Sequence, residues 1–293
     1  MFRGSYVALI TPMTEQGLVD YVSLRQMVQY QLENGTDGLI IMGTTGEAAT
    51  IPFAEQLDVL SAVLAQVDGR CQVIAGNGSN STAEAVDKTK QLAELPIDGF
   101  LTVTPYYNKP TQHGMIAHFK AVAAATEKPI LLYNVPGRTG VDLQATTVAA
   151  LANVANIVGI KEATGSMERL AQLQQLCPAD FDLLSGDDAS AAEFILQGGH
   201  GVISVTTNVA PLAMSQMIRA ARDGNRAEAL TIDATLQALH RDLFIESNPI
   251  PTKWALRQMG LIRSDMARLP LTQLEPIHAN AIEQALQQAN IKI

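Results

Sequence analysis

A lysine stands directly after a short apolar run, where an ordinary strand has no use for a charge. Lys161 follows Ile157-Val158-Gly159-Ile160 and precedes Glu162. Such a run is typical of a buried strand, and burial disfavours the charged form of a lysine. A neutral lysine is a nucleophile that attacks ketones and aldehydes to form a Schiff base. The alternative is a lysine past the strand end that reaches water or pairs with Glu162. Residues 158–162 alone favour neither interpretation.

A tyrosine ends the preceding apolar run. Tyr133 closes the run 130–133, and if the two runs are neighbouring strands, side-chain alternation lets Tyr133 and Lys161 point to the same side. Gly159 would then leave space beneath the lysine. A phenol there can protonate a carbinolamine oxygen and move a proton on or off an enamine carbon. The alternative is an ordinary strand aromatic. Beside Lys161 we favour the catalytic role.

Two further segments could bind carboxylates. Gly43-Thr44-Thr45-Gly46 offers hydroxyls and backbone N–H groups together, which suits a carboxylate, although a capped turn has the same composition. Arg138 follows a Pro-Gly pair and could grip a carboxylate with two hydrogen bonds. The alternative for this arginine is a solvated loop charge.

Other chemistry finds little support. Asp187-Asp188 with His200 fits no standard set of metal ligands, so we expect no metal. Cys71 and Cys177 fit neither a disulfide framework nor a zinc pattern and are expected to be free thiols. No Gly-x-Ser-x-Gly nucleophile elbow occurs.

The candidate residues all follow apolar runs that read as strands. Eight such runs cover residues 6–10, 38–42, 72–75, 100–103, 130–133, 157–160, 181–184 and 201–205. They are nearly continuous in hydrophobicity, as in parallel strands covered on both faces, and amphipathic segments separate them. An open doubly wound sheet is the competing fold, but its glycine fingerprint is absent after the first strand.

We therefore predict an α/β fold, a (β/α)8 TIM barrel over residues 1–210, with its site at the carboxyl ends of the strands. After residue 210 only helical spacing remains, so residues 211–293 are predicted to be a C-terminal helical extension. Residues 248–251, Asn-Pro-Ile-Pro, should break it between two helices.

Composition narrows the partners and the location. The chain has 293 residues, a net charge of −9 and no cluster of Lys or Arg, which argues against nucleic acid. The first twelve residues lack the long apolar segment of a targeting signal, and no stretch approaches the roughly 20 apolar residues of a spanning helix. We expect no membrane association and a cytoplasmic location.

Three motifs together carry a family resemblance. These are Gly43-Thr44-Thr45-Gly46-Glu47, Tyr133-Asn134-Val135-Pro136 with Arg138-Thr139-Gly140, and Gly159-Ile160-Lys161-Glu162-Ala163-Thr164-Gly165. With them the chain resembles the dihydrodipicolinate synthase family, within the superfamily of pyruvate-dependent class I aldolases and lyases. The resemblance runs over the whole chain. The related N-acetylneuraminate lyases share the lysine and tyrosine but lack an arginine like Arg138.

The resemblance implies an activity. Lys161 would form a Schiff base with pyruvate, and Tyr133 would be the proton donor and acceptor. Thr44 and Tyr107 would complete a proton relay with it, and Tyr107 would come from the neighbouring subunit of a tight dimer. The enamine of pyruvate would attack L-aspartate 4-semialdehyde on the route to diaminopimelate and lysine, with no cofactor.

The resemblance also implies how substrates are held. Thr45 would bind the pyruvate carboxylate, Ile203 and Gly186 would line the pocket, and Arg138 would hold the carboxylate of L-aspartate 4-semialdehyde. The assembly would be a homotetramer, a pair of dimers. The alternatives are a related aldolase for N-acetylneuraminate or a 2-keto-3-deoxy sugar acid, and a silent barrel that only binds a keto acid.

Many members of the family are inhibited by L-lysine in a cleft between subunits. The retained positions of that site are Ala49, Asn80, Glu84 and Tyr106. Ala48, Phe53 and Gln56 instead depart from the Ser and His residues typical of sensitive enzymes, and the loss of imidazoles removes hydrogen-bonding groups. We therefore expect weak or absent inhibition.

Overall fold

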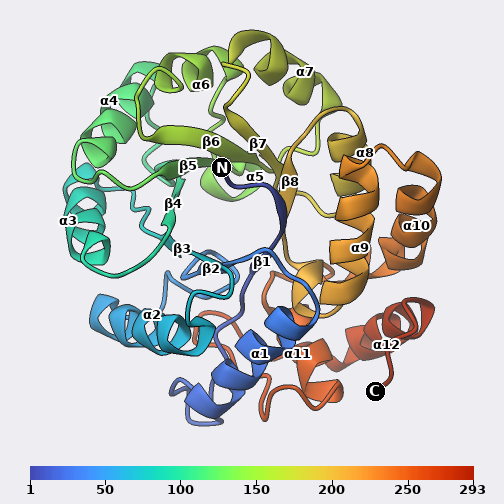
Figure 1. Ribbon diagram of the computed structural model, residues 1–293. Coiled ribbons are helices and arrows are strands. Elements are labelled where there is room, and N and C mark those ends of the chain that lie inside the picture. Colours follow the sequence, from blue (N-terminus) through green and yellow to red (C-terminus); the bar gives the residue numbers. More distant parts are fainter.

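Eight parallel strands close into a barrel in chain order, with β8 pairing back to β1 (Figure 1). The computed structural model describes all residues, 1–293. The strands are β1 (Gly4–Ala8), β2 (Gly38–Ile41), β3 (Gln72–Gly76), β4 (Gly99–Val103), β5 (Ile130–Asn134), β6 (Ile157–Glu162), β7 (Asp182–Ser185) and β8 (Gly201–Ser204). The predicted (β/α)8 barrel is confirmed, and all eight runs form strands.

The helices form a ring outside the strands. They are α1 (Tyr21–Glu33), α2 (Phe53–Val67), α3 (Thr82–Ala93), α4 (Gln112–Ala123), α5 (Pro136–Thr139), α6 (Ala145–Leu151), α7 (Met167–Leu176), α8 (Ala191–Leu196), α9 (Pro211–Arg222), α10 (Arg226–Asp242), α11 (Ile250–Gln258) and α12 (Ala279–Gln288). Two 3-10 turns, η1 (Thr206–Asn208) and η2 (Pro276–His278), complete the elements. None of the helices is both long and apolar enough to cross a membrane.

Two strands end two residues away from the sequence-based prediction, and the others end within one residue of it. Strand β1 ends at Ala8, because Leu9 keeps one backbone bond to Ile40 and the Ile10 N–H donates to the Asn208 side chain instead. Strand β6 continues past Ile160, because its pairing with β5 and β7 extends through Lys161. The lysine therefore lies within the strand and not beyond its end.

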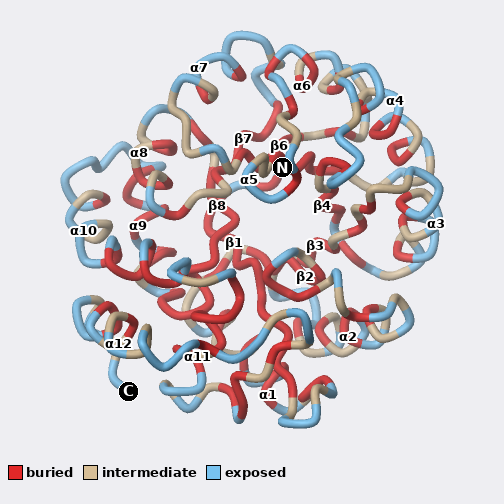
Figure 2. Tube along the Cα trace, turned by 180° about the vertical axis from the view of Figure 1, so that it is seen from behind, coloured by how far each residue is buried: buried red, intermediate tan, exposed pale blue.

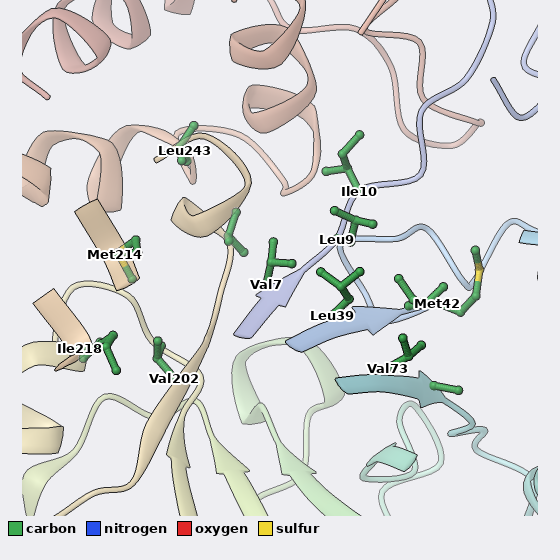
Figure 3. Packing of buried hydrophobic residues seen from close by; sticks show 14 of the residues in the cluster. Val7, Leu9, Ile10, Leu39, Met42, Val73, Val202, Met214, Ile218 and Leu243 are labelled. Atoms are coloured by element: carbon green, nitrogen blue, oxygen red, sulfur yellow. The ribbon is translucent and has the colours of Figure 1, made fainter. Parts of the chain in front are cut away.

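The core has two layers, one inside the barrel and one between strands and helices. Inside the barrel, ten buried side chains pack together: Phe2, Tyr6, Ala8, Ile40, Ile74, Leu101, Leu131, Tyr133, Leu184 and Ile203. The outer layer is a cluster of 64 buried residues. Figure 3 shows part of it, with Val7, Leu39 and Val73 on neighbouring strands and Met214 and Ile218 on α9. Figure 2 shows burial concentrated on the strands and on the inner faces of the helices.

Helix α1 begins directly after its N-cap residue, Asp20. Asp20 caps it, and its carboxylate accepts hydrogen bonds from the N–H groups of Val22 and Ser23. Ser23 lies inside the first turn and donates its hydroxyl to Asp20. Asp is as good an N-cap as Ser, and here it precedes Ser23 by three residues.

The C-terminal helices continue the ring and then fold back against the barrel. Helix α9 packs on β1 and β8, α10 packs on α9, and α12 packs on α10 and α11. Helix α11 follows the predicted break at residues 248–251 and lies on the side of the barrel where β1 and β2 lie (Figures 1 and 2). The division into units of residues 1–210 and 211–293 stays a prediction.

Candidate functional site

A cavity of about 340 Å³ opens at the carboxyl ends of the strands. It is lined by Thr44, Thr45, Tyr133, Val135, Arg138, Lys161, Ala163, Gly186, Asp187, Val205, His240, Arg241, Phe244 and Asn248. A second cavity of about 560 Å³ shares five of these residues: Thr44, Tyr133, Val135, Arg138 and Asn248. Both volumes lie in the range of small-molecule sites in proteins.

Lys161 and Tyr133 are direct neighbours across β5 and β6. They are register partners in the parallel pair, and the Lys161 Nζ lies 4.4 Å from the centre of the Tyr133 ring. Lys161 is only 5% exposed and forms no ion pair. The face of an aromatic ring attracts an ammonium without neutralising its charge. The predicted approach of these two side chains is therefore confirmed.

A glycine makes room for the lysine, but it is Gly186 and not Gly159. A methyl group on Gly186 would come 2.8 Å from the Lys161 Cε, which is closer than real Cβ contacts. A methyl group on Gly159 would instead meet the Asp182 carbonyl at 2.4 Å and Leu131 at 2.8 Å. The space above Gly159 is thus used by Leu131 of the barrel interior, and the space beside Lys161 is provided by β7.

Glu162 does not pair with Lys161, because alternation along β6 turns it to the outer side of the strand. Its carboxylate accepts hydrogen bonds from the Asn134 amide at 3.0 Å and the Thr164 N–H at 2.9 Å. Arg169 lies 3.4 Å from the same carboxylate and 2.6 Å from that of Asp142. Burial raises the pKa of Glu162, while hydrogen bonding from Arg169 lowers the pKa of Asp142.

The threonine loop presents its two hydroxyls differently. Thr45 is 2% exposed, and its Oγ1 accepts a hydrogen bond of 2.9 Å from the side-chain amide of Asn248. Thr44 is exposed and lines both cavities. The loop turns sharply, with a hydrogen bond of 3.1 Å from the Glu47 N–H to the Thr44 carbonyl. Thr45 is thus fixed, and Thr44 faces the opening.

Arg138 stands at the mouth of the cavity on the short helix α5. Its side chain is exposed, and its Nη2 donates to the Asn248 carbonyl at 3.4 Å. The guanidinium therefore keeps donors free for an incoming carboxylate. Ile203 is 1% exposed within the barrel interior and is not part of the cavity wall. Gly186 is part of it.

Tyr107 is not brought to the site by its own chain. It is 88% exposed, has a left-handed backbone with φ of 73°, and lines neither cavity. Its N–H donates to the Thr139 carbonyl at 3.3 Å, which fixes the loop that carries it. Of the predicted relay, Thr44 and Tyr133 share a cavity and Tyr107 lies apart.

The predicted lysine-binding positions are only partly together. Ala49, Glu84 and Tyr106 line the larger cavity, and Asn80 does not. Gln56 lines it too, but its amide donates to the Ala48 and Ile51 carbonyls at 3.0 and 2.7 Å.

One wall of the smaller cavity comes from the C-terminal extension, which no sequence pattern predicted. Asn248, His240, Arg241 and Phe244 all line the smaller cavity. His240 is buried and its Nδ1 lies 2.9 Å from the Thr206 hydroxyl. Asn248 immediately precedes Pro249-Ile250-Pro251. A polar side chain beside two prolines, which restrict the backbone, was the one sequence signal that pointed to Asn248.

The residues considered as metal ligands have other partners. Asp187 accepts hydrogen bonds from Ser190, Asp188 accepts them from the N–H groups of Val205 and Thr206, and His200 accepts one from the Leu183 N–H. They do not converge on one point. Cys71 and Cys177 are free, and burial raises the pKa of each thiol to about 11.

The chain is similar to known proteins over its full length. Relatives from Pseudoalteromonas atlantica and Methylococcus capsulatus, both called 4-hydroxy-tetrahydrodipicolinate synthase, are each 54% identical over 291 residues, 99% of this chain and 99% and 100% of theirs. The solved dihydrodipicolinate synthase of Acinetobacter baumannii, complexed with pyruvate, superposes with a TM-score of 0.98 at 46% identity and full coverage of both chains. That of Aquifex aeolicus gives 0.96 at 42% identity, with 99% of each chain covered. A sequence model of the dihydrodipicolinate synthetase family matches residues 1–289, and the chain belongs to that family.

Proposed function

We propose that this protein condenses pyruvate with L-aspartate 4-semialdehyde, the reaction of a 4-hydroxy-tetrahydrodipicolinate synthase. The observation that carries the proposal is the buried Lys161 amine, without an anionic partner, over the ring of Tyr133 in a cavity that also holds Thr45 and Arg138. The names of the full-length relatives support the same activity. A lysine nucleophile, a phenol and two carboxylate-binding groups match two carboxylate substrates.

The first half of the reaction binds pyruvate covalently. The neutral Lys161 Nζ adds to the C2 carbonyl, and the Tyr133 hydroxyl protonates the resulting oxygen. Loss of one water leaves an imine between Nζ and C2. Removal of a C3 proton then gives an enamine, whose C3 is the carbon nucleophile. Protons leave and return through Tyr133, with Thr44 and a Tyr107 from a neighbouring subunit as the relay.

The second half joins the two substrates. The enamine C3 attacks the aldehyde carbon of L-aspartate 4-semialdehyde and forms a carbon–carbon bond. The amino group of that substrate then adds to C2 and displaces Lys161, which closes the ring and frees the amine. One water leaves overall, so the step needs no redox partner and no cofactor.

Two groups hold the carboxylates during these steps. Thr45 hydrogen-bonds the carboxylate of pyruvate, with Gly186 bounding the same pocket. Arg138, whose remaining donors face the cavity mouth, holds the carboxylate of the second substrate in a fork. This second clamp separates the proposed reaction from a lyase acting on sugar acids.

The active assembly is proposed to be a cytoplasmic homotetramer built from two tight dimers. The reason lies in Tyr107, which is exposed and away from its own cavity. A dimer that inserts this side chain into the partner's site would complete both sites at once.

Borohydride reduction in the presence of pyruvate tests the mechanism. The imine should be reduced to a stable adduct that peptide mass mapping finds on Lys161 and not on Lys88, which lines the neighbouring cavity. Lys161→Ala should fold, give no adduct and lose turnover, and Tyr133→Phe should slow turnover by roughly 10²–10⁴-fold. Lys88→Ala is the matched control and should keep the adduct. An adduct-free wild type, or full turnover by Lys161→Ala, would overturn the proposal.

A further inference from the structure

A fully buried ion pair joins the threonine loop to the C-terminal extension. Glu47 lies two residues after Thr45, and Lys253 lies in α11. The Lys253 Nζ donates directly to Glu47 Oε1, and this is the only ion pair of the structure in which neither side chain has any exposed surface. Burial lowers the pKa of Lys253, while Glu47 opposes that change.

Two buried charges are costly for a fold, since apolar side chains of similar size often stabilise it as well or better. Here each charge is also hydrogen-bonded by a third segment. The Lys253 Nζ donates to the Met266 carbonyl at 2.7 Å, and the Arg268 N–H donates to Glu47 Oε2 at 2.9 Å. The pair therefore connects the loop after β2, helix α11 and the segment before α12 at one point.

The loop that Glu47 holds has an unfavourable backbone. Met42 and Glu47 have φ of 57° and 59°, in the left-handed region that non-glycine residues avoid. Between them lie Thr44 and Thr45. Within the loop, the Glu47 N–H closes the turn, and the N–H groups of Ala48 and Thr50 donate to the Gly43 and Glu47 carbonyls. From outside the loop, the Thr11 hydroxyl donates to the Gly46 carbonyl at 2.8 Å, and the Asn248 amide donates to Thr45. An outside anchor is needed to keep such a conformation populated.

A second contact from the extension reaches the same loop. Arg268 pairs with Glu55 in the first turn of α2 and donates to the Gly17 and Thr50 carbonyls. Residues 248–268 thus contact the segment between β2 and α2 in its middle, at Thr45 and Glu47, and near its end, at Thr50. Neither Glu47 nor Lys253 lines the cavity that contains Lys161, and of the two only Glu47 lines the adjoining larger cavity. Their effect on the Lys161 cavity therefore has to pass through the loop.

We propose that the Glu47–Lys253 pair positions the threonine loop so that Thr45 can receive the carboxylate of pyruvate. The C-terminal extension is then part of the substrate-binding apparatus, and Glu47 and Lys253 are positioning residues. This inference rests on the proposed function for the identity of the ligand.

Paired substitutions separate positioning from stability. Lys253→Met and Glu47→Leu alone each strand a buried charge and should lower the melting temperature. The double variant Glu47→Leu/Lys253→Met removes both charges of the pair, so its melting temperature should recover most of the loss seen in the single variants. In that double variant, amide hydrogen exchange over residues 43–51 should still be faster than in wild type without any ligand. The KM for pyruvate should rise by roughly tenfold with a smaller change in kcat, as expected for lost binding.

The matched control removes another contact between the extension and the barrel. Arg226 of α10 pairs with Glu193 of α8 at 2.8 Å, on an exposed surface away from the loop. Glu193→Gln/Arg226→Met should leave both the exchange over residues 43–51 and the KM unchanged. If the Glu47→Leu/Lys253→Met variant does not fold, the isosteric Glu47→Gln variant replaces it. Faster exchange over residues 43–51 and a higher KM for pyruvate are expected there too.

The outcomes are distinct. If the folded Glu47→Leu/Lys253→Met variant shows wild-type hydrogen exchange and a wild-type KM, the positioning role is overturned. The ion pair would then have a structural role only. A wild-type protein that forms no pyruvate adduct would overturn the proposed function, while the exchange measurement would still test the anchoring of the loop.

Discussion

A single amide decides which way the Thr45 hydroxyl points. Asn248 donates to Thr45 Oγ1, so the hydroxyl proton of Thr45 is left to donate elsewhere. A substrate carboxylate can only accept hydrogen bonds, so this is the polarity that the proposed role of Thr45 requires. The Asn248 oxygen is used in turn by the Thr252 hydroxyl at 3.4 Å.

Asn248→Asp should therefore harm pyruvate binding more than Asn248→Ala. An aspartate only accepts, so it would take the Thr45 proton and leave lone pairs and a negative charge facing the substrate carboxylate. We expect the KM for pyruvate to rise about fivefold in the alanine variant, the worth of one hydrogen bond, and clearly more in the aspartate variant. Steady-state kinetics on both variants checks the order. Equal KM values would contradict it.

The sequence predicted the approach of Lys161 and Tyr133 well because its signal is local. Each ends an apolar run, and alternation along two adjacent strands is enough to bring them together. Asn248 was missed because 203 residues separate it from Thr45, and no local pattern encodes that contact. Gly186 was identified by resemblance only, and its steric relation to Lys161 comes from the barrel register.

At the scale of elements, β5 and β6 are held together on the side opposite to the site. The Asn134 amide bridges Asp142 and Glu162, and Arg169 binds both carboxylates from α7. These contacts lie one residue after Tyr133 and one after Lys161. The network therefore fixes the two strand ends that carry Tyr133 and Lys161.

The Asp142–Arg169 pair should give an acid-dependent share of stability. Hydrogen bonding from Arg169 lowers the pKa of Asp142 below its ordinary 3.8. A lowered value in the folded state means stabilisation that is present above pH 3.8 and lost as the pH falls through the folded value. The difference in unfolding free energy between wild type and Asp142→Asn should shrink over that window, as urea titrations at several pH values can measure. The control is Glu168→Gln, an exposed position next to Arg169 on α7, which should show no such dependence on pH. A pH-independent difference for Asp142→Asn would contradict the prediction.

The cleft next to the site should respond weakly to L-lysine. Gln56 spends its amide donors on backbone carbonyls, and Glu84 already accepts the Ser79 hydroxyl at 2.7 Å. Gln56 therefore has no free amide donor for an amino acid, and the Ser79 hydroxyl competes with such a ligand for Glu84. A kinetic titration with L-lysine should show little inhibition, and Glu84→Gln should remove what is present. Strong inhibition at low millimolar lysine or below would refute this.

At the scale of the molecule, topology was predictable and docking was not. Eight evenly spaced apolar runs with helices between them leave few arrangements other than a closed barrel. Helices α9 to α12 were identified by periodicity, but amphipathic spacing does not say which surface a helix covers. The burial of Lys253 against Glu47 depends on that docking, and a lysine in a helix is usually a solvent-facing residue.

Mixing two inactive variants should restore activity if Tyr107 acts across an interface. In a mixed dimer of Lys161→Ala and Tyr107→Phe chains, one site combines an intact Lys161 with the Tyr107 of the other chain. We expect about half the wild-type activity per mixed dimer, since one of its two sites is complete. Co-expression with two affinity tags isolates the mixed assembly. A chain carrying both substitutions, paired with Lys161→Ala, is the inactive control, and no recovery in the first mixture would place Tyr107 outside the partner's site.

The sole tryptophan of the chain is Trp254, next to Lys253 in α11 and half-buried against the outer core. The wavelength of indole fluorescence depends on the polarity around the ring. All tryptophan fluorescence of this protein therefore comes from the helix that contacts the threonine loop. Tryptophan fluorescence of the unmodified protein thus reports on whether α11 is packed against the barrel. It needs no added label and has no background from a second indole.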